Sequence, residues 1–287
     1  MLWGFFKKVV VADNCALFVN GVFENYQTLD GSTLFLGAFF FTIQIYGDFS
    51  GYSDIAIGCA RLFGIDLMQN FKYPYFSRDI AEFWRRWHIS LTTWFRDYIY
   101  IPLGGSRVGK WKSFRNTLVI FLVSGFWHGA NWTFVAWGAY HALLFLPLLL
   151  LGQNRRYRDS VAENSFLPSV KELTQMGVTF LLVLLGWILF RSEDISQAAV
   201  YLERMFNASL FSAPQLVGLG FGQLLLKKCF FFTALMFIVE WIGRKQAHGL
   251  MIEDLSLPVR YVIYTVLLII IYGFDASNPQ GFIYFQF

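Results

Sequence analysis

The sequence predicts an all-α, polytopic integral membrane protein built from short, tilted and broken helices. Of its 287 residues, 56% are hydrophobic, 20% aromatic and only 15% charged, whereas a soluble domain has roughly 45–50% apolar and 25% charged residues. The mean hydropathy is +0.48, and 33 Phe, 14 Tyr and 10 Trp exceed what one water-soluble core could hide. A soluble globular protein is therefore excluded.

Charge and cysteine content exclude further classes. The 23 basic and 19 acidic residues leave a net charge of +4, which is too small to indicate a nucleic-acid partner. Cys15, Cys59 and Cys229 have no metal-ligand or redox spacing and indicate no disulfide framework. The first residues do not resemble a signal peptide, because the lysines follow apolar residues and no small-residue cleavage site is present. We expect a single membrane-embedded domain over residues 1–287.

Apolar stretches give the expected helices in chain order, and few of them are clean twenty-residue spans. They lie near residues 1–23, 33–47, 55–64, 116–127, 131–151, 176–190, 229–242 and 259–274. No internal repeat is visible, which counts against the inverted-repeat architecture of many transporters.

Two clusters of basic residues flank the apolar region 116–151. Residues 107–115 carry four of these charges and residues 155–158 carry three, so both flanks are expected on the cytoplasmic side. The region is too long for one span, and the sequence GFWHGAN at 125–131 interrupts it. We expect a shorter helix going in and a longer one returning, with Trp127, His128 and Asn131 deep in the membrane. Irregular backbone at that depth must be buried in protein or line a cavity.

Residues 78–98 are charged and predict an amphipathic helix at the membrane surface. Its expected polar face, toward solvent or headgroups, holds Asp79, Glu82, Arg86, Thr93 and Asp97. Its apolar face holds Ala81, Trp84, Leu91 and Phe95, with His88 in the middle. We therefore expect His88 to point inward and to share a passage with His128, with Trp84, Trp127 and Asn131 near its wall.

The two histidines differ in how strongly the sequence favours a role in chemistry. Taken alone, His88 is more typical of a structural histidine bonded to a carbonyl. His128 favours function, because ionisable groups inside a membrane are costly and a histidine can accept a proton from an attacking hydroxyl. No zinc-protease, paired-cysteine, nucleophile-elbow or phosphate-loop motif offers a rival mechanism or a metal site. His141 and His248 are interpreted as structural.

A third polar patch, QIYGDFSGYSD at 44–54, brings Asp48 and Asp54 to the membrane or its edge. Its glycines predict a broken helix. Two interpretations stay equally open for the carboxylates: they cap helix ends at the interface, or they line a passage for donor or acceptor.

Four blocks together resemble the membrane-bound O-acyltransferases, and among these the bacterial branch that acetylates alginate. They are residues 46–58, residues 70–75 (NFKYPY), residues 82–91 with 94–105, and residues 125–130 (GFWHGA). The resemblance extends to the aromatic end at 282–287. Family members are longer, and residues 7–13 resemble an interior stretch of theirs, so N-terminal helices of the family are expected to be absent here.

The resemblance implies an all-helical enzyme of the bacterial inner membrane with several spans around a central passage. It implies that His128 matches the family's invariant histidine and His88 its second histidine. It also implies a cytoplasmic thioester donor such as acetyl-CoA, no bound cofactor, an extracytoplasmic polysaccharide acceptor, and partner transferases outside the membrane. A transporter or channel using Asp48, Asp54 and His128, and an inactive remnant or scaffold, remain the alternatives.

Overall fold

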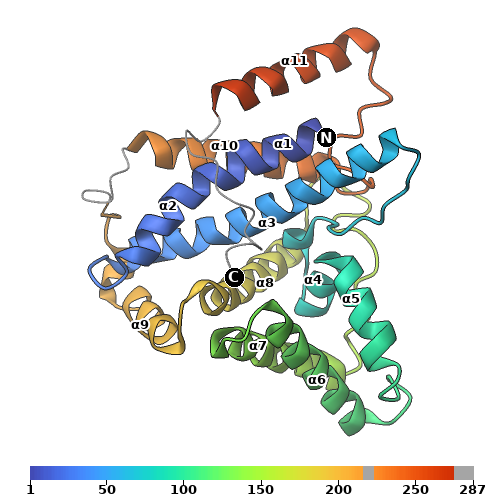
Figure 1. Cartoon of the computed structure of the whole chain (residues 1–287), viewed down its shortest axis with the longest axis vertical. Coiled ribbons are helices and arrows are strands. Elements are labelled where there is room, and N and C mark those ends of the chain that lie inside the picture. The colour runs from blue at the N-terminus through green and yellow to red at the C-terminus, as the bar shows by residue number, and fades with distance from the viewer. Residues whose placement is uncertain (216–222, 275–287) are drawn as a thin grey trace. The chain divides into compact units, whose positions relative to one another are not determined.

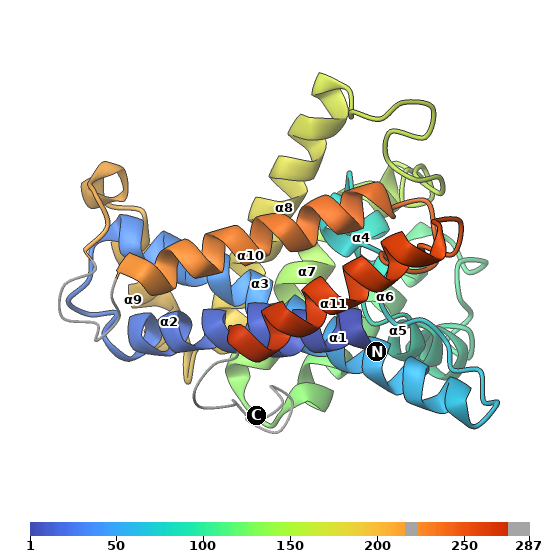
Figure 2. The same ribbon diagram turned by 90° about the horizontal axis from the view of Figure 1, so that it is seen from above.

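The computed structural model describes residues 1–215 and 223–274, and within these ranges every regular element is a helix (Figures 1 and 2). The predicted all-α class is confirmed. The chain divides into two compact units: unit 1 combines residues 1–69 with the chain from residue 200 on, and unit 2 is Asn70–Ala199. α7 and α8, both in unit 2, are long and apolar enough to cross a membrane. The aromatic end at 282–287 lies outside the described residues.

The α-helices are named as in Figure 1. They are α1 (Leu2–Phe5), α2 (Asp13–Glu24), α3 (Gly31–Leu62), α4 (Ile80–Arg86), α5 (Ile89–Phe95), α6 (Lys110–His128), α7 (Trp132–Leu150), α8 (Val170–Arg191), α9 (Ile195–Met205), α10 (Gln223–Ile242) and α11 (Leu257–Gly273). Short π-helical segments cover Phe6–Ala12 and Arg96–Tyr100, and 3-10 turns cover Pro74–Phe76 and Ala208–Phe211.

In unit 1 the first helices pack along α3, which runs unbroken for 32 residues. The predicted break at 44–54 is therefore wrong. A Cβ on Gly51 would lie 2.7 Å from the carbonyl oxygen of Gly4, and one on Gly47 would lie 3.1 Å from that of Lys7. The glycines let two helical backbones approach each other, as small residues do at helix contacts in membranes, and α3 does not bend there.

Further unit 1 contacts join distant parts of the chain. The Tyr201 hydroxyl donates to the Leu34 carbonyl at 2.7 Å, and the Asn14 amide donates to the Phe274 carbonyl at 2.9 Å. Both of these polar side chains are buried, so each hydrogen bond satisfies a group that would otherwise lose its water.

In unit 2, α6 and α7 form an antiparallel hairpin linked by residues 129–131 (Figure 1). The predicted interruption at 125–131 is confirmed, but the expected unequal lengths are wrong, because both helices have 19 residues. A Cβ on Gly125 would lie 2.2 Å from the Phe134 carbonyl oxygen, and one on Gly138 would lie 2.3 Å from that of Phe121. Two glycines, one on each helix, thus allow the backbones to touch.

The basic flanks of this hairpin lie together. Lys110 begins α6, and its Nζ donates to the carbonyl of Leu150, the last residue of α7, at 3.2 Å. The two basic flanks therefore continue from the same end of the hairpin, as the positive-inside pattern predicts for two ends on one side.

The predicted single helix over 78–98 is wrong. The chain forms α4 and α5 with a break at Trp87 and His88, followed by the π-helical segment. Asp79 caps α4 by accepting from the Glu82 N–H at 2.6 Å, a usual arrangement at a helix start. The break has a tertiary cause, because Asn70 accepts hydrogen bonds from the first N–H groups of α5.

Candidate active site

His88 lies at the break between α4 and α5 in a left-handed conformation, with φ 44°. The segment 70–72 holds this turn. The Asn70 carbonyl accepts from the Ile89 N–H at 3.0 Å, and its side-chain oxygen accepts from the Ser90 N–H at 3.2 Å. These bonds satisfy donors at the start of α5 that have no partner inside the helix, so Asn70 fixes where His88 stands.

His128 is the last residue of α6 and lies among aromatic rings. Its ring centroid is 5.3 Å from that of Trp137 on α7 and 5.0 Å from that of Phe190 on α8, both edge-on. Phe134 lies 6.3 Å away. The imidazole is half-buried, so three helices orient it while part of its surface stays accessible.

The structure brings the two histidines together around Trp127. The Trp127 ring centroid is 6.3 Å from that of His88 and 5.1 Å from that of His128, so one indole lies beside both imidazoles. Trp84 of α4 packs against Trp137, a neighbour of His128, at 5.5 Å. Two imidazoles in one cluster can act on one substrate, one as a base and one as a hydrogen-bonding group.

Burial sets the protonation of His88, lowering its pKa to about 4. The imidazole is therefore neutral near pH 7, with one nitrogen that donates a hydrogen bond and one that accepts. That state suits a group that positions a hydroxyl or a carbonyl.

Asn131 begins the return helix. Its side chain accepts from the Thr133 N–H at 3.1 Å and donates to the Glu193 carbonyl at 2.6 Å. These bonds cap α7 and tie the hairpin tip to the end of α8, so Asn131 has a structural task three residues from His128. The neighbouring Trp127 and Trp132 are exposed, as tryptophans at bilayer interfaces are. A deep position for the tip stays a prediction.

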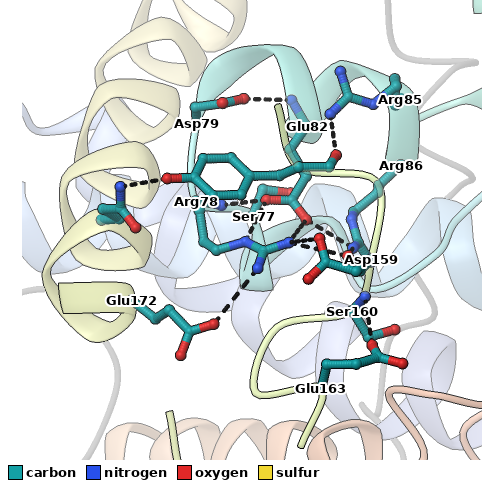
Figure 3. Close-up of polar contacts among 12 residues, drawn as sticks. Ser77, Arg78, Asp79, Glu82, Arg85, Arg86, Asp159, Ser160, Glu163 and Glu172 are labelled. Carbon is teal, nitrogen blue, oxygen red and sulfur yellow. Dashed lines mark hydrogen bonds and ion pairs between the residues drawn. The ribbon is translucent and has the colours of Figure 1, made fainter. Parts of the chain in front are cut away.

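The predicted charged face of residues 78–98 is mostly wrong, because its centre is buried. Glu82 is 1% and Arg86 8% exposed, whereas Asp97 is exposed. Glu82 binds Arg86 at 2.7 Å and Arg78 at 3.1 Å (Figure 3). In Figure 3 the Arg78 guanidinium also points toward Asp159 and Glu172, at 3.1 and 3.5 Å.

This ion cluster joins α4 to the loop before α8. Arg78 and Arg86 both donate to the Asp159 carbonyl at 3.0 Å. Desolvation raises the pKa of the Asp159 carboxyl, but the hydrogen bond and charge of Arg78 and hydrogen bonds from backbone N–H groups leave the pKa below its usual value. Arg78 and Glu82 are buried, and buried charges need such paired partners. The cluster therefore supports the helix that leads into His88.

Asp48 and Asp54 belong to unit 1. Asp48 pairs with Lys8 at 2.7 Å and Asp54 with Lys7 at 2.8 Å, and Asp54 also lies 3.5 Å from His248 Nε2. Capping is wrong as their explanation, because both lie inside the continuous α3. Their ion pairs tie α3 to the first helices; a place on a substrate passage stays a prediction.

Sequence reasoning missed Asn70 and Arg78. The sequence assigns no role to Asn70 in the motif block 70–75, and it predicts Arg78 on a helix rather than in a buried cluster. No periodicity identifies either, since both act on residues that only folding brings near. As for metals, no group of three or more His, Cys, Asp or Glu that could hold an ion occurs within residues 1–215 and 223–274.

Comparison with known proteins identifies the family. The model of the membrane-bound O-acyltransferase family matches residues 19–160, which include both histidines. The probable alginate O-acetylase AlgI of Pseudomonas aeruginosa is 42% identical over 228 residues, covering 78% of this chain and 42% of the relative.

Two further relatives act on other polymers by name. The peptidoglycan O-acetyltransferase of Helicobacter pylori is 40% identical over 202 residues, covering 70% of this chain and 37% of the relative. The teichoic acid D-alanyltransferase of Bacillus subtilis is 29% identical over 202 residues, covering 66% and 49%. The chain spans about two fifths of the length of its alginate-type relatives. The chain belongs to the membrane-bound O-acyltransferase family, a family of membrane proteins.

Proposed function

We propose that this chain carries the catalytic histidines of a multi-pass inner-membrane O-acyltransferase. It transfers an acetyl group from a cytoplasmic thioester, such as acetyl-CoA, to a hydroxyl of an extracytoplasmic polysaccharide such as alginate, directly or through a partner transferase outside the membrane. The observation that most directly supports this proposal is the cluster of His88, Trp127 and His128. His88 and His128 come from two of the blocks that carry the resemblance to this family, residues 82–91 and 125–130.

The reaction needs one base and one acid in turn. His128 takes the proton from the acceptor hydroxyl as its oxygen attacks the thioester carbonyl carbon. The carbon–sulfur bond then breaks, and the leaving thiolate takes that proton from the imidazolium. The products are an ester and a free thiol. His88, neutral near pH 7, hydrogen-bonds to the donor or acceptor and positions it. Such acid–base catalysis contributes about 10²–10⁴-fold in rate.

The hairpin supports the direction of transfer. The basic residues lie at the end where α6 begins and α7 ends, and His128 lies at the other end of α6. If the basic end faces the cytoplasm, the histidine cluster lies toward the far side, where an exported acceptor arrives. Trp84 and Trp127 would then line the path of the acyl group, with Asn131 holding the tip.

The test is transfer of label. Vesicles containing the chain, with its partner transferase where transfer is indirect, receive labelled acetyl-CoA and polysaccharide. We expect label bound covalently to polysaccharide with the unaltered chain, and none with His128→Ala at equal membrane expression. His248→Gln, which alters a histidine of unit 1, should leave transfer unchanged. Acetylation that survives His128→Ala contradicts the proposal.

The same vesicles separate the alternatives. A transporter or channel would move intact solute across the membrane and leave no covalent label. A scaffold would do neither. The ion pairs of Asp48 and Asp54 with lysines of the first helices favour structural roles for these carboxylates over proton or solute binding.

A further inference from the structure

A cavity of about 390 Å³ in unit 2 has a basic lining that the acyl-transfer chemistry does not use. It is lined by Lys72, Arg85, Arg86, Arg155, Tyr157, Arg158 and Ser160. Five of these seven residues are cationic and none is acidic. The lining comes from the motif segment 70–75, from α4 and from the loop before α8, all of them outside the two candidate spans.

The walls of the cavity are fixed by hydrogen bonds. Arg85 donates to the carbonyls of Asn154 and Tyr157, and Arg86 donates to the Lys72 carbonyl at 3.2 Å. These bonds join the loop, α4 and the motif segment, so the loop's cations are held near those of the helix. The backbone segments that carry the cations are thus held together before a ligand binds, which reduces part of the entropic cost of binding.

Of the five cations, Arg86 alone forms an ion pair among residues 1–215 and 223–274, and it shares its partner Glu82 with Arg78. Lys72, Arg155 and Arg158 are exposed. Burial lowers the pKa of Arg85, and the positive charges of Arg86 and Arg158 lower it further, although Asp79 and Glu82 oppose them. Cations gathered this closely repel one another unless an anion joins them.

We propose that this cavity binds the phosphate groups of an anionic ligand, with Arg155, Arg158 and Lys72 as its main contacts. Guanidinium groups bind phosphate through paired, charge-assisted hydrogen bonds. Phosphates could come from a nucleotide-linked thioester in the aqueous phase or from an anionic lipid headgroup. That the ligand is the acyl donor rests on the proposed function; phosphate binding does not.

Calorimetric titration of the full chain in an uncharged detergent tests the proposal. The probes are coenzyme A, pantetheine, which has the same thiol arm without phosphates, and lipid nanodiscs of phosphatidylcholine with or without phosphatidylglycerol. Binding of coenzyme A but not pantetheine identifies the soluble source. Preference for phosphatidylglycerol discs identifies the lipid source. In either case binding should weaken as salt rises, because screening acts on charge pairs.

The variant Arg155→Gln/Arg158→Gln should lower the affinity about tenfold or more, the effect of losing a charge-assisted hydrogen bond. Arg156→Gln is the matched control, because Arg156 lies in the same loop but packs over the Tyr157 ring at 5.2 Å and does not line the cavity. Absence of binding to every phosphate-bearing probe overturns the proposal, as does an equal loss in both variants. His128→Ala should abolish transfer and leave this binding intact, so failure of one proposal is distinguishable from failure of the other.

Discussion

Glu82 is the central residue of the ion cluster that holds α4, the helix before His88. It is 1% exposed and bonds to two arginines at once. We expect Glu82→Gln to lower the free energy of unfolding by about 3–5 kcal/mol, because it leaves buried charges uncompensated. Thermal unfolding in detergent measures this. The control Asp97→Asn removes an exposed pair with Arg96 and should change stability little. Equal effects of the two variants would refute a buried cluster.

His88 should make stability depend on pH. Its pKa is about 4 in the folded chain and about 6.5 when unfolded, so the unfolded state binds the proton more tightly. Stability is therefore fully present above pH ~6.5 and falls as pH drops toward 4. His88→Asn removes the imidazole and keeps a residue type that tolerates a left-handed backbone. Unfolding curves of the variant should show a smaller loss over that pH range; an identical loss would refute the prediction.

At the scale of elements, the α6–α7 hairpin depends on its glycines. A Cβ at Gly138 would lie 2.3 Å from the Phe121 carbonyl oxygen, whereas one at Gly177 on α8 meets nothing within 4 Å. We expect Gly138→Ala to destabilise by about 1–3 kcal/mol through overpacking. Gly177→Ala should stabilise by about 0.5–1 kcal/mol, since alanine favours helix. Unfolding midpoints compare the two, and a neutral Gly138→Ala would contradict the close backbone contact.

The sequence predicted elements well where a local signal decided them. The interruption at 125–131 marks the hairpin turn, and Ala81 and Phe95 are buried as the helical period indicates. The sequence predictions were wrong where contacts with residues distant in the chain determine the local structure. The break at His88 depends on Asn70, which takes the first N–H groups of α5. Gly47 and Gly51 predict a helix break from the sequence, but in the structure they allow the backbone of the first helices to approach α3 closely.

The same distinction applies to the candidate site. The chemistry and sequence context of His88 and His128 predict both as site residues, and both lie beside Trp127 in the structure. Their aromatic surroundings and the ion cluster behind them combine α4, α6, α7, α8 and a loop. Such a combination is a property of the folded chain, and a periodic pattern within one segment does not contain it.

At the scale of the whole molecule, the hairpin predicts a topology. Lys112 and Gln153 are exposed near its basic end, whereas Ala130 is exposed at its tip. In a chain whose Cys15, Cys59 and Cys229 are replaced, single cysteines are introduced as Lys112→Cys, Gln153→Cys and Ala130→Cys. A membrane-impermeant maleimide should label the first two only from the cytoplasmic face, since basic flanks stay inside. If the tip reaches the opposite interface, the reagent should label Ala130→Cys only from that face, because 19 residues of helix span about 28 Å, close to the hydrocarbon thickness. A tip that stays deep in the membrane, as the sequence predicts, would leave Ala130→Cys unlabelled from either face. Labelling of all three from one face would mean that the hairpin does not cross the membrane, and His128 would then have no route to an exported acceptor.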